Sequence, residues 1–252
     1  MINPMDLSGK KVLVTGGSSG IGRATCIQLS RLGAQVIMIA RNEQKLNQTL
    51  DQMEGDNHLL FKFDLYDING IESFMKNLIS ETGALDGLVH CAGIAPMRPL
   101  NMTTNKFLND IFVINVYAFI ELSRLFAKKG NFNPNSSIVV MSSTASFQGG
   151  KTKIAYSASK GALNSAVKSM AVELADKKIR VNTVCPSFVE TALLEEYTTL
   201  VGEEARIKQL EKQYAGYIPS ESVANAIAYL LSKTSEHITG TDFIIDAGAT
   251  SH

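Results

Sequence analysis

Tyr156 and Lys160 form the residue pair whose spacing most directly suggests chemistry. They lie four positions apart in a run with helical periodicity, so both side chains fall on one face of the expected helix. A phenol with a pKa near 10 is a poor acid–base catalyst at neutral pH, but an ammonium about 4 Å away could lower that pKa by as much as about 3 units. The pair therefore predicts a general acid–base centre. The alternative is a lysine that extends over a core tyrosine.

A glycine-rich segment near the N-terminus predicts a phosphate-binding loop. Residues 15–22 read TGGSSGIG and lie between an apolar run and a helical run. Glycines let the backbone approach a ligand, and the start of a helix presents free N–H groups and a positive dipole end. A pyrophosphate is therefore the expected ligand, although a plain tight turn would have the same composition.

The residues after the second and third apolar runs bear on the choice of cofactor. The second run ends at Ala40 and is followed by Arg41. A carboxylate there would bind the ribose hydroxyls of NAD(H), whereas an arginine can bind a 2′-phosphate with two N–H groups. Arg41 therefore favours NADP(H) over NAD(H), with a solvated arginine at a helix start as the alternative. Asp64 is a candidate for the adenine amino group or, alternatively, a helix N-cap.

These residues fall at the ends of apolar runs that alternate with helical segments. The runs are continuous rather than alternating, as in parallel strands that are buried on both faces. We therefore expect one α/β domain over residues 1–252, a doubly wound Rossmann-type sheet of seven parallel strands with helices on both faces. Residues 187–219 fit neither pattern and are predicted to form a substrate lid or, alternatively, a surface helix pair. The expected strands are 11–15, 36–40, 59–63, 88–90, 137–141, 179–184 and 243–245, and the expected helices are 21–32, 42–53, 71–79, about 105–129, 155–175 and 222–232.

Composition and charge narrow the function classes. The 24 basic and 24 acidic side chains balance, which argues against a nucleic-acid partner. No apolar run approaches the roughly 18 residues of a membrane span, and the first residues lack a signal-peptide core, so we expect a cytoplasmic protein without a membrane partner. Three widely spaced cysteines suit a reducing compartment. The four histidines show no ligand spacing, so no metal is expected.

The order of these motifs resembles the short-chain dehydrogenase/reductase superfamily. The resemblance rests on the loop at 15–22, Asn115, Ser143, YSASK at 156–160 and DAG at 246–248. The resemblance covers essentially the whole chain. Within the superfamily, the sequence is similar to the single-domain branch that includes 3-oxoacyl-(acyl-carrier-protein) reductases. The resemblance implies an oxidoreductase that transfers a hydride between NADP(H) and a ketone or secondary alcohol. Tyr156 would be the general acid or base, Lys160 would also bind the nicotinamide ribose, Ser143 would hydrogen-bond the substrate oxygen, and Asn115 would hold a proton-relaying water.

The resemblance also implies a cofactor-binding set and reveals two departures from the family pattern. His90 and Cys91 stand where the family often has two asparagines, and His90 is the candidate to replace their bracing hydrogen bonds. Ser187 replaces a glycine after Pro186, and we expect its N–H still to face the nicotinamide. The implied contacts are Gly16, Ser18, Ser19, Gly20, Ile21, Gly22, Arg41, Asp64, Leu65, Ala92, Gly93, Tyr156, Lys160, Pro186, Ser187, Val189 and Thr191.

Other functions and partners stay open at this point. A catalytically silent NAD(P)-sensing regulator would not need the serine, tyrosine and lysine, and a sugar-nucleotide epimerase would have a larger C-terminal region. Residues 128–180 hold nine basic and two acidic side chains, which predicts either a landing patch for an acidic acyl carrier or ordinary lysines at helix C-termini. Arg98 could meet an anionic substrate or be solvated, and steroid, sugar and small diketone substrates remain possible. The resemblance further implies a homotetramer in which the helices of Asn115 and Tyr156 pack across a two-fold axis.

Overall fold

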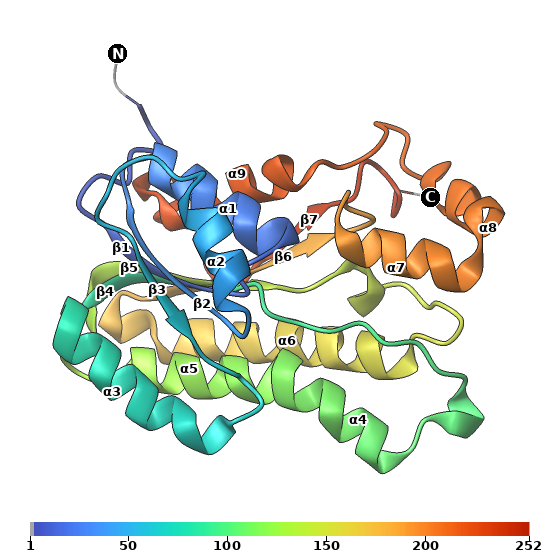
Figure 1. Ribbon diagram of the computed structural model, residues 1–252, viewed down its shortest axis with the longest axis horizontal. Helices are drawn as coiled ribbons and strands as arrows, with labels where there is room; N and C mark the ends of the chain where they lie inside the picture. Colours follow the sequence, from blue (N-terminus) through green and yellow to red (C-terminus); the bar gives the residue numbers. More distant parts are fainter. Residues whose placement is uncertain (1–2, 252) are drawn as a thin grey trace.

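The computed structural model describes residues 3–251, apart from the side chains of Glu196, Val201, Ala205 and Gln209. Within this range seven parallel strands form one sheet in the order β3-β2-β1-β4-β5-β6-β7 (Figure 1). The expected doubly wound sheet is therefore confirmed. The strands are β1 (Lys11–Thr15), β2 (Gln35–Ala40), β3 (Leu59–Lys62), β4 (Leu85–His90), β5 (Phe132–Met141), β6 (Arg180–Pro186) and β7 (Asp242–Ile245).

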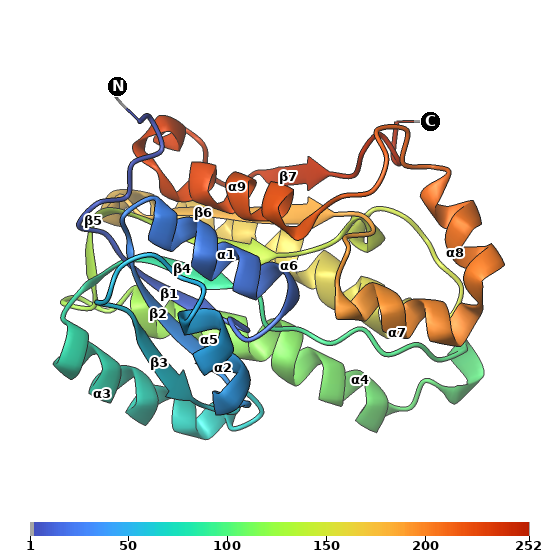
Figure 2. The same ribbon diagram turned by 45° about the horizontal axis from the view of Figure 1, so that its top comes forward.

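Helices cover both faces of the sheet, which explains why the strands read as continuous apolar runs. Successive strand residues point to opposite faces, so Leu13 joins one buried cluster while Val12 and Val14 join the other. In Figures 1 and 2, one layer contains α1 (Gly20–Arg31), α2 (Glu43–Leu50) and α9 (Ser220–Leu231), and the other contains α3 (Ile71–Thr82), α4 (Asn105–Phe112), α5 (Ala118–Phe126) and α6 (Ile154–Glu173). Three-residue 3₁₀ turns are η1 (Ile68–Gly70), η2 (Leu100–Met102), η4 (Thr144–Ser146), η5 (Ala175–Lys177) and η6 (Lys233–Ser235).

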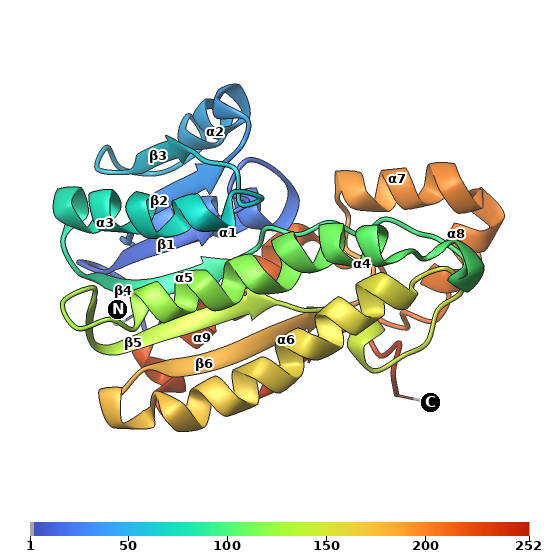
Figure 3. The ribbon, with the colours of Figure 1, turned by 90° about the horizontal axis from the view of Figure 1, so that it is seen from below.

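Two segments differ from the sequence prediction, and a third, for which a lid or a helix pair was expected, contains two helices. The helix expected over about 105–129 is interrupted between α4 and α5 by a π-helical turn, η3 (Val113–Tyr117). Strand β5 begins earlier than expected, and its pairing with β4 shifts register between Leu85 and Gly87. Residues 187–219 contain two helices, α7 (Ala192–Val201) and α8 (Glu203–Leu210), which project past the carboxyl ends of the strands (Figures 1 and 3).

The topology of the sheet predicts where the site lies. Strand β1 pairs with β2 on one side and β4 on the other, so the chain reverses its direction of winding between β1 and β4. In open α/β sheets ligands bind at this switch point, beyond the carboxyl ends of the strands. Within the described residues, no helix has the length and apolar character needed to cross a membrane.

Candidate functional site

A cavity of about 1640 Å³ opens at the carboxyl ends of the strands. Of the residues that the sequence assigns to the site, all except Asn115 line this cavity. The glycine-rich loop and the segments after β2 and β3 line one half. Ser143, Tyr156, Lys160 and the segment after β6 line the other. The fold therefore brings the predicted cofactor and catalytic residues into one site.

The glycine-rich loop packs too closely for side chains at two of its positions. A Cβ at Gly22 would lie 2.2 Å from the Gly16 carbonyl oxygen, and a Cβ at Gly16, where φ is +70°, would lie 2.9 Å from the Ala92 nitrogen. Ser19 precedes α1 and makes no side-chain capping bond, so the first N–H groups of α1 lack intrahelical partners. This close backbone approach with free N–H groups fits a dinucleotide pyrophosphate.

Arg23 and Thr49 brace this loop from behind. Arg23 donates from Nη2 to the Ser18 carbonyl (2.7 Å) and from Nε to Thr49 Oγ1 (3.2 Å). Thr49 in turn donates to the Gly17 carbonyl (3.0 Å). Neither residue belongs to a recognisable sequence motif, because only the packing of α2 beside α1 brings Thr49 to the loop.

The cavity beyond β2 contains more positive charge than the sequence analysis assigned to it. Arg41, Lys45 and Lys62 all line it, and Lys62 is the register partner of Ala40. Lys62 could not be placed there from sequence, because the β2–β3 register decides it. Asp64 also lines the cavity and accepts a hydrogen bond from the Tyr66 N–H (3.0 Å). The alternative interpretation of Asp64, as a helix N-cap, is wrong because Asp67 caps the following turn.

Tyr156, Ser143 and Lys160 meet at the other half of the cavity. Lys160 is 4% exposed, and its Nζ lies 5.6 Å from the centre of the Tyr156 ring. Nζ donates to the Met141 carbonyl at 2.6 Å. The Ser143 side chain lies near enough to Tyr156 to lower the pKa of its phenol. The first turn of α6 and the end of β5 thus hold a phenol, a hydroxyl and an ammonium together.

Burial sets the protonation of this group. It lowers the pKa of Lys160 to about 8. It also raises the pKa of Tyr156, an effect that the Ser143 hydrogen bond partly opposes. The net downward shift expected for the pKa of Tyr156 is therefore not found in the chain by itself. The Lys160 ammonium is directed to the Met141 carbonyl rather than to the phenol oxygen.

Asn115 lies behind the cavity wall, in the π-helical turn. It is fully buried, accepts a hydrogen bond from the Ile94 N–H (2.9 Å) and donates to the Ile94 carbonyl and Ser159 Oγ, both at 3.0 Å. A Cβ at Gly93 would lie 3.3 Å from Asn115 Oδ1 and 3.6 Å from Lys160 Nζ, so all three meet at one point. A π-turn within a helix often marks a functional site. Here it aims Asn115 at the segment after β4, and its water-holding role stays a prediction.

His90 replaces the bracing hydrogen bonds, as expected. Its Nδ1 lies 3.1 Å from Thr15 Oγ1, and its Nε2 lies 3.3 Å from the Ile114 carbonyl. Thr15 Oγ1 also accepts a hydrogen bond from the Ala92 N–H (3.1 Å). Burial, together with the charge of Lys160, lowers the pKa of His90 to about 3, so its imidazole is neutral. This histidine ties β1, β4 and the π-turn together and does not line the cavity.

The segment after β6 departs from the sequence expectation. The Ser187 N–H donates to the Ile245 carbonyl (3.0 Å), so the expectation that it faces the nicotinamide is wrong. Buried Gln213 instead fixes the next residue, since it accepts from the Phe188 N–H (2.9 Å) and donates to the Phe188 carbonyl (3.3 Å). Thr191 begins α7, and its Cγ2 would contact a Cβ at Gly20 at 3.3 Å. Gln213 gives no sequence signal, because 25 residues separate it from Phe188.

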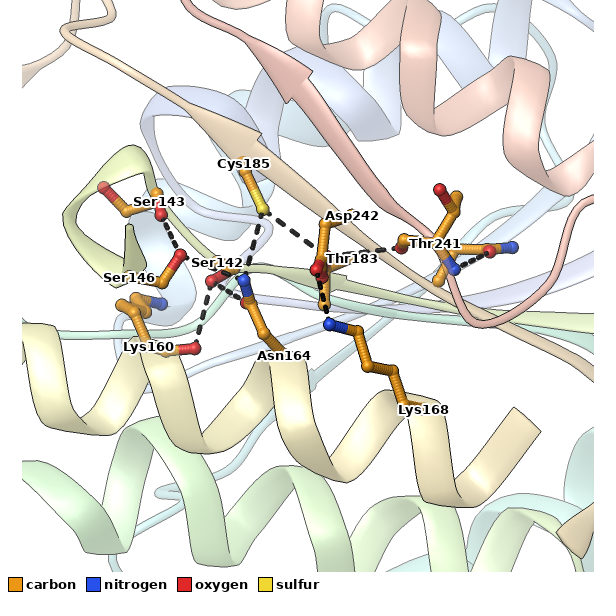
Figure 4. A network of polar contacts seen from close by, with 11 residues as sticks. Ser142, Ser143, Ser146, Lys160, Asn164, Lys168, Thr183, Cys185, Thr241 and Asp242 are labelled. Atoms are coloured by element: carbon orange, nitrogen blue, oxygen red, sulfur yellow. Dashed lines mark hydrogen bonds and ion pairs between the residues drawn. The ribbon is translucent and has the colours of Figure 1, made fainter. Parts of the chain in front are cut away.

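A buried polar network supports the catalytic side of the cavity from within (Figure 4). Asn164 is its centre, with Oδ1 2.5 Å from Ser142 Oγ and Nδ2 donating to Ser146 Oγ at 3.0 Å. Ser142 Oγ also lies 3.2 Å from the Lys160 carbonyl, and Ser146 donates to the Ser143 carbonyl (2.6 Å). Through Ser146 and Ser142, Asn164 therefore links the backbone of Ser143 to the backbone of Lys160.

The basic residues proposed as a landing patch lie at the other edge of the sheet. Lys128 and Lys129 follow α5, and Lys177 and Lys178 lie beyond the end of α6, where the chain returns to the amino ends of β5 and β6. At 1.5 Å per residue, Glu173 is about 25 Å along α6 from Tyr156. Lys128 also pairs with Glu72 at 2.6 Å. The helix-end lysines therefore do not form a landing patch at the cavity entrance, because they lie at the opposite end of the sheet.

Comparison with known proteins agrees with this geometry. A family model described as enoyl-(acyl carrier protein) reductase matches residues 16–250. Relatives include a 3-oxoacyl-(acyl-carrier-protein) reductase of Rickettsia conorii, 34% identical over 97% of this chain and 98% of its own, and an L-xylulose reductase of Caenorhabditis elegans, 31% identical over 96% of each. A Sinorhizobium meliloti dehydrogenase/reductase superposes with a TM-score of 0.90 at 27% identity, covering 98% of this chain and 97% of that one.

The chain belongs to the short-chain dehydrogenase/reductase superfamily. It is an NAD(P)-dependent oxidoreductase.

Proposed function

We propose that this protein reduces a ketone, or oxidises the corresponding secondary alcohol, with NADP(H). The observation that carries the proposal is the meeting of Ser143, Tyr156 and Lys160 in the same cavity as the glycine-rich loop. When bound, the nicotinamide supplies or accepts the hydride. Because the serine, tyrosine and lysine are all present and adjacent, catalysis is favoured over a silent NAD(P)-sensing role.

The side chains divide the proton chemistry between them. Tyr156, whose pKa is raised by burial, carries its proton at neutral pH and donates it to the carbonyl oxygen during reduction. Ser143 holds that oxygen through its hydroxyl. Lys160 stays charged below about pH 8 and stabilises the phenolate that remains. Asn115 fixes Gly93 and Ile94 beside Lys160, where a water held by Asn115 would return the proton.

NADP(H) is favoured by the charge beyond β2. Arg41 follows Ala40 directly, and Lys45 and Lys62 line the same part of the cavity. A 2′-phosphate there would meet three cations. Lys45 and Lys62 thus extend the proposed phosphate site beyond the arginine.

Exchange of Tyr156 for phenylalanine tests the catalytic assignment. We expect Tyr156→Phe to bind NADPH normally and to lose about 10²–10⁴-fold in kcat on the best ketone from a substrate panel. Tyr229→Phe is the matched control, because Tyr229 packs against Phe243 and does not line the cavity. Near-normal kcat in Tyr156→Phe would remove this tyrosine from the mechanism.

A carrier-bound 3-oxoacyl substrate is the narrower candidate. It is favoured by the name of the Rickettsia relative. The basic residues after α5 and α6 lend it no support, since they lie at the opposite edge of the sheet. Turnover of a 3-oxoacyl carrier conjugate at least ten times faster than of a short free ketone would favour it.

We further infer a lid, a homotetramer and a cytoplasmic location. Leu193, Tyr197 and Leu200 of α7 line the cavity, which favours a lid function for residues 187–219. Exposed apolar side chains on the outer helix layer, including Tyr117 at 44% and Ile120 at 40%, suit a subunit interface. The three free cysteines suit a reducing compartment.

A further inference from the structure

Lys153 is a cation on the substrate side of the cavity that the proton chemistry above does not use. It is the N-cap residue of α6 and stands three positions before Tyr156. Its Nζ lies 4.9 Å from the ring centre of Phe188 and 4.6 Å from that of Tyr197. The side chains of Lys153, Tyr156, Phe188 and Tyr197 all line the cavity. The ammonium is thus held at the wall that a substrate on Tyr156 would touch.

The surroundings fix the position of this ammonium. Its aliphatic stem lies along Gly150, where a Cβ would come within 3.1 Å of Lys153 Cδ. Phe188 and Tyr197, whose ring centres are 5.1 Å apart, hold the other side. Cation–π contacts attract the ammonium but leave its N–H groups for hydrogen bonds with a ligand. A lysine ordered in advance loses less conformational freedom when an anion binds.

Lys153 has no carboxylate partner among the side chains that the structure describes. Burial lowers its pKa, and no described carboxylate opposes this shift. Partly buried cations that lack a protein partner are well suited to bind a ligand anion. No described carboxylate therefore competes with a ligand for the N–H groups of Lys153.

The described charged side chains that line the substrate side of the cavity all carry the same sign. On the substrate side they are basic, with Arg98 and Lys212 lining the cavity in addition to Lys153 and Lys160. Among the residues that the structure describes, the acidic side chains that line the cavity are Glu43 and Asp64, which lie with Arg41, Lys45 and Lys62 in the half assigned to the adenosine of the cofactor. Cavity walls of one sign concentrate ligands of the opposite charge.

We propose that Lys153 determines substrate specificity by binding an anionic oxygen group, a carboxylate or a phosphate, on the same molecule as the reacting ketone. The faces of Phe188 and Tyr197 pack on the carbon chain between the two groups. This inference rests on the proposed ketone reduction and deepens it, since it specifies the substrate class as anionic ketones.

Matched substrate pairs test the inference. The probes are 4-oxopentanoate and 5-oxohexanoate against their methyl esters, and dihydroxyacetone phosphate against dihydroxyacetone. Each pair is measured with the wild type, Lys153→Gln, Lys153→Arg and Lys151→Gln, a control at an exposed lysine outside the cavity. For one anion class, carboxylate or phosphate, we expect the wild-type kcat/KM for the anionic ketone to be about 10- to 150-fold higher than that for its neutral partner. Lys153→Gln should abolish this preference through KM for the anion, and Lys153→Arg should keep part of it.

Two results would overturn the inference and leave ketone reduction standing. One is equal use of anionic and neutral partners by the wild type. The other is an equal loss for both partners in Lys153→Gln, which would mean that the lysine only holds α7 in place.

Calorimetric titration of the same anions into the protein with NADP⁺ gives a readout that is independent of turnover. We expect Lys153→Gln to weaken the binding of the preferred anion about 10-fold or more, with Lys151→Gln unchanged. Absence of turnover with every ketone would refute the proposed reduction, while this titration would still decide the role of Lys153. Equal affinity in wild type and Lys153→Gln, or no binding of any anion, would refute the anion site.

Discussion

Replacing Lys160 by methionine should remove activity and change how stability depends on pH. Burial lowers the pKa of Lys160 from 10.5 to about 8, a difference of about 2.5 units. At about 1.36 kcal/mol per unit, keeping this ammonium charged at pH 7 costs the folded state about 3 kcal/mol. Lys160→Met removes that cost and also removes the hydrogen bond to the Met141 carbonyl, which stabilises by about 1.5–3 kcal/mol. The two effects nearly cancel at pH 7.

The pH dependence separates these two effects. Below about pH 8 both the folded and the unfolded chain bind the Lys160 proton, so the cost is constant. Between about pH 8 and 10.5 only the unfolded chain binds it, so wild-type stability rises with pH relative to Lys160→Met. From pH 7 to pH 9.5 the free energy of unfolding of the wild type should therefore rise by about 2 kcal/mol relative to that of Lys160→Met. This rise does not depend on how strongly the lost hydrogen bond stabilises the protein.

Urea denaturation of the cofactor-free protein at pH 7 and pH 9.5 measures this gain. Lys151→Met serves as the control, because Lys151 is exposed and its ammonium is hydrated in both states. Its stability difference from wild type should be the same at both pH values. A difference between wild type and Lys160→Met that also stays constant would show that Lys160 is not desolvated in the folded protein, and the assignment of a lowered pKa would fail.

Three further outcomes are expected. Arg41→Ala should raise KM for NADPH about 10- to 150-fold and leave NADH almost unchanged, whereas an equal effect on both cofactors would leave Arg41 as a solvated helix-start residue. Amide hydrogen exchange in residues 187–219 should slow when NADPH and a substrate analogue are added, and equal protection with and without them would make α7 and α8 a static helix pair. Asn164→Leu should destabilise the protein by about 1–3 kcal/mol and lower kcat more than it raises KM, because Ser142 and Ser146 lose their shared partner. Urea denaturation and steady-state kinetics would test that variant, and an unchanged kcat would limit Asn164 to a structural role.

Local spacing accounts for the parts of the site that were predicted from sequence. Tyr156 and Lys160 share a face because an α-helix advances 3.6 residues per turn, whatever the rest of the chain does. The glycines of residues 15–22 predict a close backbone approach because no other residue leaves out the Cβ. The continuous apolar strands predict a parallel sheet because both faces must be buried. Each of these properties is written within a short stretch of chain.

The tertiary structure decided what depends on contacts between distant segments. Lys62 pairs with Ala40 and lines the same cavity as Arg41 because of the β2–β3 register, and Lys153 packs on Phe188 and Tyr197 because α7 returns over the start of α6. The direction of the pKa shift at Tyr156 belongs here too, since burial by the assembled fold outweighs the opposing effect of Ser143. Spacing fixes which side chains share a face. The solvation of those side chains and the groups they contact depend on the three-dimensional packing of segments that are far apart in the sequence.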